Sequence, residues 1–320
     1  YTTNIGIDAR FFDRFGVTID LYNKNTSDLL YYAPLPNISG YTGQYKNVGA
    51  INNKGLEISL NADVIRTSKF QWTSDFNIGF NRNRVTELYG GKPELKGLKR
   101  LEEGRDMDEW YLREWAGVDP ANGSPLWYTT DENGKRTTTD SYNKADRVYC
   151  GSAAPKFTGG WMNSFSYKGF TLTANFDFVY GNLLYNQSRE LLDSDGAYAD
   201  YNSMKLKSGW KRWEKEGDIA THPKAINGGN KNSNKSSSRY LEKGNYFSLR
   251  NLSLGYSIPE KLCGKLGLQR VNVSCSADNL FTLTPFSGVS PQLSDSSTDG
   301  YAGTIYPLSR RIVFGLNVSF

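Results

Sequence analysis

The sequence predicts an all-β protein whose strands form part of the wall of an antiparallel transmembrane β-barrel. Three observations support this fold class: long segments in which apolar and polar residues alternate, connections that are in turn short and long, and aromatic residues beside the short connections. Only alternate residues of a barrel strand face lipid, so its average hydropathy stays low. A hydrophobic content of 38% is therefore compatible with a membrane barrel.

The alternation defines the expected strands. In the final segment, "YPLSRRIVFGLNVSF", large apolar residues occupy every second position from Ile312 to Phe320. Comparable runs place strands at 3–12, 15–31, 45–65, 70–88, 157–168, 170–186, 241–258, 269–283 and 308–320. Between 88 and 157, "EWYLREWAGVD" and "SPLWYTT" could add two strands or none, which gives 9–11 strands in all.

The connections separate the two ends of these strands. Short links at 13–14, 66–69 and 168–169 alternate with long ones at about 23–45, 89–156, 187–240 and 284–306. Porin-like barrels have short periplasmic turns and long extracellular loops. The aromatic residues expected at the level of the short links are Phe12, Phe15, Phe70, Trp72, Tyr167, Phe170 and Phe320. A secreted β-sandwich or propeller with long loops is the alternative.

An open sheet in lipid would leave its edge backbone groups unpaired, at a cost of several kcal/mol each. We therefore expect further strands to close the barrel. Tyr1 leads directly into strand-like sequence without an initiator Met or a signal peptide, so we expect the chain to be a piece of a longer protein.

The polar faces of the strands carry acidic residues. If the apolar faces meet lipid, four carboxylates point into the lumen: Glu57, Asp63, Asp75 and Asp177. The net charge of +5 is not gathered into one basic stripe, so nucleic acid is not an expected partner. Cys150, Cys263 and Cys275 are widely spaced and odd in number, which favours free thiols.

The sequence offers little for catalysis or metal binding. His222 in "IATHPKAI" is the single histidine, and we expect it to be a solvent-exposed loop residue rather than part of a Ser/His/Asp or Cys/His site. "DENGK" at 131–135 has the start of a calcium loop, but Lys135 replaces an oxygen ligand and no Glu closes the pattern. We expect a β-turn there, no metal site and no enzymatic activity.

The loop at 187–240 holds the strongest candidates for ligand contact. "NQSRELLDSD" and "SMKLKSGWKRWEKEGD" have helix-like apolar spacing. Trp210, Arg212 and Trp213 could offer ring faces and hydrogen-bond donors to a sugar or peptide, although packing of the loop is the favoured role of the two tryptophans. Tyr41, Tyr45 and Tyr301, in other loops, are further candidates for substrate binding.

Several motifs together resemble one family. The chain is similar to the C-terminal third of SusC-like TonB-dependent outer-membrane transporters of Bacteroidota. The similarity rests on "NVGAINNKGLEISLNADVIRTSKFQWTSDFNIGF", "YKGF", "SRYLEKGNYFSLRN", "DNLFT", "FSGVSP" and the final strand, in the family's order over nearly the whole chain.

The resemblance implies a 22-stranded barrel in the cell outer membrane, closed by an N-terminal plug and energised through a TonB box, neither of which lies in residues 1–320. Implied partners are the rest of the barrel and plug, the TonB complex, a SusD-like lipoprotein lid, a glycan or peptide ligand, and membrane lipid or lipopolysaccharide. Glu57, Asp63, Asp75 and Asp177 would then also contact the plug, and calcium would be the only inorganic ligand to consider. Outer-membrane barrels commonly end on a strand with a terminal aromatic residue such as Phe320. A passive porin or adhesin-like barrel and a secreted carbohydrate-binding β domain remain alternatives.

Overall fold

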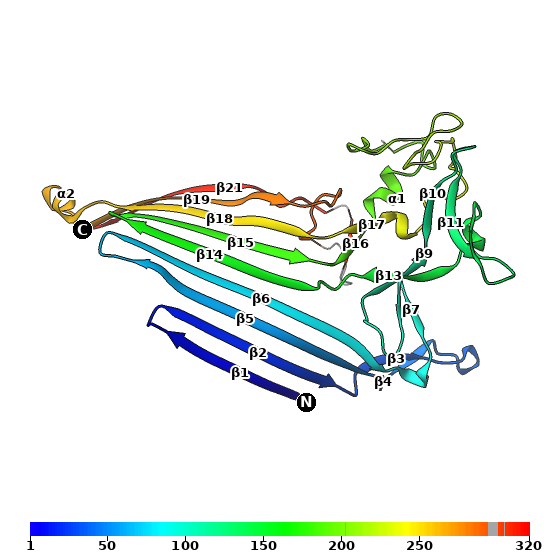
Figure 1. Cartoon of the computed structure of the whole chain (residues 1–320), viewed down its shortest axis with the longest axis horizontal. Coiled ribbons are helices and arrows are strands. Elements are labelled where there is room, and N and C mark those ends of the chain that lie inside the picture. Colours follow the sequence, from blue (N-terminus) through cyan, green and yellow to red (C-terminus); the bar gives the residue numbers. More distant parts are fainter. Residues whose placement is uncertain (202, 294–299, 304) are drawn as a thin grey trace.

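The structure is a computed structural model that describes residues 1–201, 203–293, 300–303 and 305–320. A nine-stranded sheet, which we call the wall, carries a group of small sheets at one end (Figure 1). We call this group the cap; it consists of the described residues of the segments 88–156, 181–245 and 284–303. The structure confirms the expected all-β fold of antiparallel strands, as in a transmembrane β-barrel. Within the described residues, the sheet is open and does not close into a barrel.

Each wall strand is antiparallel to its neighbours, and chain order is also sheet order. The wall strands are β1 (Thr2–Phe11), β2 (Phe15–Thr26), β5 (Ala50–Arg66), β6 (Phe70–Glu87), β14 (Phe157–Tyr167), β15 (Phe170–Tyr180), β18 (Tyr246–Ser257), β19 (Arg270–Leu283) and β21 (Arg311–Ser319).

The remaining elements are shorter. A hairpin of β3 (Leu30–Pro34) and β4 (Gly43–Asn47), with η1 (Asn37–Ser39) at its tip, joins β2 to β5. The cap contains η2 (Tyr89–Gly91), β7 (Glu94–Lys96), β8 (Lys99–Leu101), β9 (Glu109–Arg113), β10 (Trp115–Val118), β11 (Pro125–Thr130), β12 (Arg136–Thr139), η3 (Tyr142–Lys144), β13 (Arg147–Ser152), β16 (Leu183–Asn186), α1 (Ser188–Leu192), η4 (Ser238–Tyr240), β17 (Leu241–Lys243) and β20 (Tyr301–Ala302). The helix α2 (Glu260–Lys265) joins β18 to β19. Among the described residues, no helix is both long enough and apolar enough to cross a membrane.

The wall has nine strands because the ambiguous segments between 88 and 157 belong to the cap. β9 pairs with β8 and β13, whereas β10 pairs with β11 in a different sheet. These strands are four to six residues long, and a membrane strand needs about ten. The interpretation with no additional crossing is therefore the right one.

The two ends of the wall differ in their connections. The turns after β1, β5 and β14 gather at one end, which we call the turn end, and the long connections gather at the cap end (Figure 1). Between β14 and β15, Lys168 and Gly169 both have positive φ, of 47° and 88°. Two successive positive φ values are typical of the tight hairpin turn that matches strand twist, and glycine adopts them without steric cost.

The strand register divides the wall into an apolar face and a polar face. Residues directly opposite each other in neighbouring strands share a face. Ile7, Ile19, Ile58 and Ile78 are paired in this way and form one continuous row on the apolar face. The four predicted acidic residues lie on the other face, since Glu57 pairs with Gly79, Asp63 with Thr73, Asp75 with Met162, and Asp177 with Gly160.

Aromatic residues cluster at the turn end, as the sequence predicts. Phe70 contacts Tyr167 and Phe165, with ring centroids 6.4 and 6.5 Å apart, and Phe170 contacts Tyr256 at 4.3 Å. On the apolar face, the indole of Trp72 donates a hydrogen bond to Asn163 Oδ1 at 3.1 Å. The polar atom of this ring is thereby satisfied within the sheet.

Among the described residues, the clusters of buried hydrophobic side chains lie in the cap. Trp110, Leu112, Ala153, Tyr185 and Tyr240 form a cluster of buried side chains contributed by two separate connections, and Tyr301 of a third connection packs against it. Trp110 donates a hydrogen bond from its indole nitrogen to the carbonyl oxygen of Leu183 at 2.9 Å. The cap is therefore one packed unit. The three cysteines are free thiols.

Candidate functional site

A cavity of about 400 Å³ lies where the polar face of the wall meets the cap. Four amide side chains line it: Asn81, Asn83, Asn182 and Gln292. Tyr246, Tyr301 and Asp108 also border the cavity. Uncharged hydrogen-bonding groups thus dominate its polar lining.

The wall and the cap each position part of this lining. Asn81 and Asn83 alternate along β6, so both lie on the polar face. Asn182 follows β15, and its amide packs against the backbone of Gly244: a Cβ added at Gly244 would come within 2.6 Å of Asn182 Nδ2. Among the described residues, Asn182 Oδ1 and Gln292 Nε2 are buried without a hydrogen-bond partner. A buried polar atom without a partner costs roughly 1–3 kcal/mol, so a ligand that pairs with it gains affinity.

Tyr246 connects the cavity to an acidic side chain of the wall, Asp177. Tyr246 donates a hydrogen bond from its hydroxyl to Asp177 Oδ2 at 3.1 Å. Arg250 Nε lies 3.7 Å from Asp177 Oδ1. Asp177 is thus fixed on the polar face next to Tyr246, which borders the cavity.

A second cavity of about 180 Å³ adjoins the first along the same face. Glu57, Asn81 and Tyr22 line it. The ring of Tyr22 lies over Gly55, where a Cβ would come within 2.2 Å of the ring, and its hydroxyl donates to Asn81 Oδ1 at 3.0 Å. Because Asn81 borders both cavities, they form one polar surface at the cap end of the wall.

Tyr301 is the predicted ligand residue that the structure places in the main cavity. Its ring packs edge-on against Trp110, with centroids 5.1 Å apart, and its hydroxyl accepts a hydrogen bond from the backbone N–H of Leu98 at 3.1 Å. Burial raises the pKa of the Tyr301 hydroxyl, which therefore stays protonated at neutral pH.

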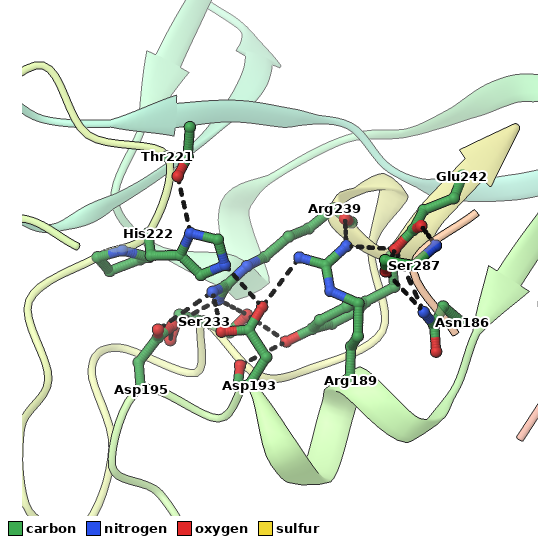
Figure 2. A network of polar contacts seen from close by, with 12 residues as sticks. Asn186, Arg189, Asp193, Asp195, Thr221, His222, Ser233, Arg239, Glu242 and Ser287 are labelled. Carbon is green, nitrogen blue, oxygen red and sulfur yellow. Dashed lines mark hydrogen bonds and ion pairs between the residues drawn. The ribbon is translucent and has the colours of Figure 1, made fainter. Parts of the chain in front are cut away.

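In the cap, a buried network of charged residues holds the 181–245 connection in place (Figure 2). At its centre, Asp193 accepts hydrogen bonds from Arg189 at 2.9 Å and Arg239 at 3.2 Å. His222 Nε2 lies 3.0 Å from Asp193 Oδ2, and its Nδ1 lies 2.8 Å from the hydroxyl of Thr221. Three segments far apart in the chain meet at this one carboxylate.

Asp195 is the second centre of the network. It accepts hydrogen bonds from Arg212 at 2.6 Å, from the hydroxyl of Ser233 at 2.6 Å, and from Arg239. The side chains of Asp193 and Asp195 are fully buried. Buried carboxylates are stable only when they are paired and hydrogen-bonded, as these are.

Arg189 connects the network to Glu242, and through it to the connection after β19. Arg189 Nη1 donates to Glu242 Oε1 at 2.9 Å. Glu242 also accepts hydrogen bonds from the backbone N–H and the hydroxyl of Ser287, at 2.7 and 2.6 Å. The arginines 189, 212 and 239 thus face three carboxylates, those of Asp193, Asp195 and Glu242.

These contacts shift the protonation equilibria in the cap. Burial alone would raise the pKa of Asp193. The hydrogen bond from His222 and the charges of Arg239, His222 and Arg189 outweigh that effect and hold its pKa at about 2. Burial also raises the pKa of Tyr185, and the neighbouring carboxylate of Glu190 raises it further. Asp193 therefore stays charged at neutral pH.

The structure corrects two predictions about this connection. His222 is 1% exposed, not a solvent-exposed loop residue, because its imidazole completes the buried network. No helix forms over 203–218, whereas "NQSRELLDSD" contains α1. The apolar spacing in 203–218 comes instead from tryptophans that pack on other segments.

The three predicted ligand residues of this connection are engaged within the cap. Trp213 donates from its indole nitrogen to the carbonyl oxygen of Pro120 at 2.9 Å. The guanidinium of Arg189 lies 4.4 Å from the ring centroid of Trp210, and the ring of His222 lies 4.9 Å from it. Arg212 is bound to Asp195. These packing contacts agree with the favoured role of the tryptophans; ligand contact by Trp210, Arg212 or Trp213 stays a prediction.

Tyr41 and Tyr45 lie elsewhere, on the β3–β4 hairpin and its tip (Figure 1). Both are largely exposed, and Tyr45 contacts the ring of Tyr32 with centroids 5.1 Å apart. The structure does not bring them together with Tyr301. Part of the predicted loop 284–306, namely 294–299 and 304, lies outside the described residues.

The segment "DENGK" forms the expected turn. Asp131 Oδ1 accepts hydrogen bonds from the backbone N–H groups of Asn133 and Lys135, at 2.9 and 2.8 Å. Within the part of the chain that the structure describes, no group of three or more His, Cys, Asp or Glu residues is placed to hold a metal ion.

The sequence analysis missed the amides that line the cavity. A signal for Asn81 and Asn83 was present, because both occupy polar-face positions of the alternation in β6. Asn182 and Gln292 carried no comparable signal, since they lie in irregular connections that only the folded cap brings together.

The fold and the site define a class: the wall of a large antiparallel barrel, with a polar cavity under a packed cap. Residues 1–280 match the family described as TonB dependent receptor-like, beta-barrel. The chain therefore belongs to the TonB-dependent receptor β-barrel family. This family consists of transport proteins, in agreement with the expectation that the chain is not an enzyme.

Individual relatives support the resemblance to SusC-like proteins. A TonB-dependent receptor of Formosa agariphila is 30% identical over 99% of this chain and 35% of its own length. The TonB-dependent receptor SusC of Bacteroides thetaiotaomicron is 24% identical over all of this chain and 32% of its own. The solved structure of the RagAB peptide transporter superposes with a TM-score of 0.86 and 28% identity, over all of this chain and 35% of that one. The chain thus spans about a third of the length of these relatives.

Proposed function

We propose that the chain forms barrel wall and outer loops of a TonB-dependent importer of glycan or peptide nutrients in the cell outer membrane. The observation that carries this proposal is the amide-lined cavity at the cap end of the polar face. Its neutral donors and acceptors suit the hydroxyl groups of a sugar or the amide groups of a peptide equally. Asn182 Oδ1 and Gln292 Nε2, which have no hydrogen-bond partner, could pair with a donor and an acceptor of such a ligand.

The apolar face supports a position in the membrane. Its side chains are exposed along whole strands: Phe314 is 79% exposed, Leu316 70% and Ile5 64%. Soluble proteins rarely expose contiguous apolar surfaces of more than a few hundred Å². In this proposal the apolar face contacts lipid, the polar face borders the lumen, and the cap lies outside the cell.

The partners follow from the same arrangement. The free edges of β1 and β21 would pair with other barrel strands, because unpaired edges do not occur in lipid. Glu57, Asp63, Asp75 and Asp177 would contact water and the plug. The cap and the β3–β4 hairpin would meet a SusD-like lipoprotein, and the TonB complex would act on a plug outside these residues.

The test uses the full-length protein, purified in detergent together with its lipoprotein. Native mass spectrometry followed by fragmentation identifies a co-purified ligand as glycan or peptide. Asn182→Leu removes an unpartnered cavity amide, and Asn227→Leu, at an exposed cap position, is the matched control. We expect Asn182→Leu to lower ligand occupancy at least tenfold and Asn227→Leu to leave it unchanged.

Equal occupancy in both variants would overturn the cavity as the ligand site. Uptake that persists after an ionophore collapses the proton gradient would instead support a passive porin. A protein that stays monodisperse without detergent would support the secreted carbohydrate-binding alternative.

A further inference from the structure

The apolar face ends abruptly toward the cap. Ile5, Leu21, Leu56 and Phe80 are paired across β1, β2, β5 and β6 and form its last apolar row. The next row, in the same strands, consists of Thr3, Asn23, Lys54 and Arg82. Two residues of a strand span about 7 Å, so hydrophobic side chains give way to cations within that distance.

One row further, Asn25, Asn52 and Arg84 continue the polar belt. The amide of Asn52 donates to both Asn23 Oδ1 and Asn25 Oδ1 at 2.6 Å. These hydrogen bonds fix the belt along β2 and β5. Lys54, Arg82 and Arg84, which we call the basic belt, are exposed beside it.

The basic belt lacks internal charge compensation. Lys54 and Arg82 are directly opposite each other, and like charges in that position destabilise a sheet. Among the described residues, no carboxylate lies within 4 Å of the charged nitrogens of Lys54, Arg82 or Arg84. Two other wall arginines are paired: Arg311 lies 2.8 Å from Asp278, and Arg66 lies 3.8 Å from Asp63. An external anion would relieve the repulsion.

We propose that Lys54, Arg82 and Arg84 bind the phosphate groups of an anionic lipid in the outer leaflet. The proposal rests on the proposed orientation of the barrel in the membrane. A lipid whose acyl chains lie on the isoleucine and leucine rows would carry its headgroup at the height of the basic belt. Guanidinium groups match phosphate oxygens in a bidentate geometry, and the lysine adds a point charge.

Aromatic residues beside the basic belt favour a lipid over a free anion. Phe80 contacts Phe157, which in turn contacts Tyr180, with centroids 5.8 and 5.0 Å apart. Aromatic rings gather at the boundary between hydrocarbon and headgroups. The site therefore places an apolar surface directly beside an anion-binding surface, and an amphiphilic lipid needs both.

The experiment measures binding of diphosphorylated lipid A to the full-length, delipidated protein by native mass spectrometry in detergent. The variant Lys54→Gln/Arg82→Gln/Arg84→Gln removes the three charges. The matched control Lys24→Gln/Lys135→Gln/Lys205→Gln removes three exposed lysines elsewhere; Lys24 lies at the same height on the polar face, paired with Asn53. We expect at least tenfold weaker binding by the first variant and unchanged binding by the control.

Four further measurements complete the test. Dephosphorylated lipid A should bind the native protein and the first variant equally weakly, and millimolar inorganic phosphate should not displace the lipid. Arg82→Lys/Arg84→Lys, which keeps the charges, should retain most of the binding. Heat-modifiable migration in gels reports whether each variant forms the barrel, independently of lipid binding.

Lipid A binding by a correctly folded glutamine variant at the native level would overturn the basic belt as the site. Displacement by inorganic phosphate would also overturn it, in favour of a simple anion site. If no variant and no native protein showed barrel migration, the proposed membrane function itself would fail.

Discussion

The wall and the cap of this protein differ in whether their apolar side chains are buried. In the wall, apolar side chains such as Phe314 and Ile5 are exposed, and its strands pair only edge to edge. In the cap, Trp110 and Trp127 are 0% exposed, and even the charged side chains of Asp193 and Arg239 are buried. The cap buries its apolar and charged side chains against its own residues, whereas the apolar face of the wall needs an apolar environment to cover it.

This difference predicts where each region is vulnerable. The cap depends on specific pairs of charges and hydrogen bonds that no solvent can replace. The wall depends on which face a side chain occupies, because its two faces meet different surroundings.

The largest effect is expected from Arg239→Met in the cap. The change removes an arginine that hydrogen-bonds to both Asp193 and Asp195, and losing one partner of a buried ion pair costs up to about 3–5 kcal/mol. Amide hydrogen exchange of the 181–245 connection in the full-length protein should accelerate accordingly. The control Arg136→Met breaks an exposed pair with Glu114, 2.9 Å apart, and should cost less than about 1 kcal/mol. Equal exchange in both variants would refute the structural importance of the network.

The second prediction concerns the faces of the wall. Phe76→Arg places a charge on the apolar face, and near the bilayer midplane this should cost roughly 2–4 kcal/mol. Asn77→Arg, one residue away on the polar face, should be tolerated. The measurement is the denaturant midpoint of the full-length protein refolded into liposomes. A larger loss for Asn77→Arg would reverse the assignment of the faces.

The third prediction is a response of the cap to acid. The pKa of Asp193 is about 2 in the folded cap, below its ordinary value of 3.8. A depressed pKa contributes stability that is present above the ordinary value and lost as pH falls toward the folded value. At about 1.4 kcal/mol per pKa unit, the contribution is on the order of 2 kcal/mol. Hydrogen exchange of 181–245 should stay constant from pH 7 to 5, after correction for intrinsic rates, and rise below about pH 4.

Asp193→Asn serves as the control for this response. The variant should be less protected at neutral pH and should lack the additional loss between about pH 4 and 2. An unchanged acid response in Asp193→Asn would assign the effect to other carboxylates.

The smallest effect is expected from Tyr22→Phe on the polar face. The change removes the hydrogen bond from the hydroxyl to Asn81 at 3.0 Å, which is worth about 1 kcal/mol. Tyr41→Phe, at a residue that is 73% exposed, should change nothing measurable. The denaturant midpoint in liposomes again gives the comparison, and equal midpoints would show that water replaces the contact without loss.

The wall could be predicted from the sequence because its information is local. A strand with alternating polarity specifies its own two faces, and one register then aligns Glu57, Asp63, Asp75 and Asp177 on the same face. The position of Asn81 and Asn83 on the polar face could also be predicted from the alternation in β6. The strand ends were less predictable: β15 ends at Tyr180 although the apolar pattern continues to residue 186.

The cap could not be predicted because its contacts join residues far apart in the chain. His222 was expected in solvent, yet it lies beside Asp193, 29 residues earlier. Asn182 and Gln292 meet in one cavity although more than a hundred residues separate them. No periodicity marks such a meeting, since irregular segments have no repeating relation between position and direction.

The sequence by itself determined the β class, the two faces of the wall, the asymmetry of its connections and the family. It could do so because alternation, turn residues and motifs are properties of neighbouring positions. Only the tertiary structure decided that the wall has nine strands, that the 181–245 connection is held by buried ion pairs, and where a polar cavity forms. Those outcomes depend on contacts between segments far apart in the chain. Burial makes each such contact of a charge or an amide important, because a buried polar group without a partner is costly.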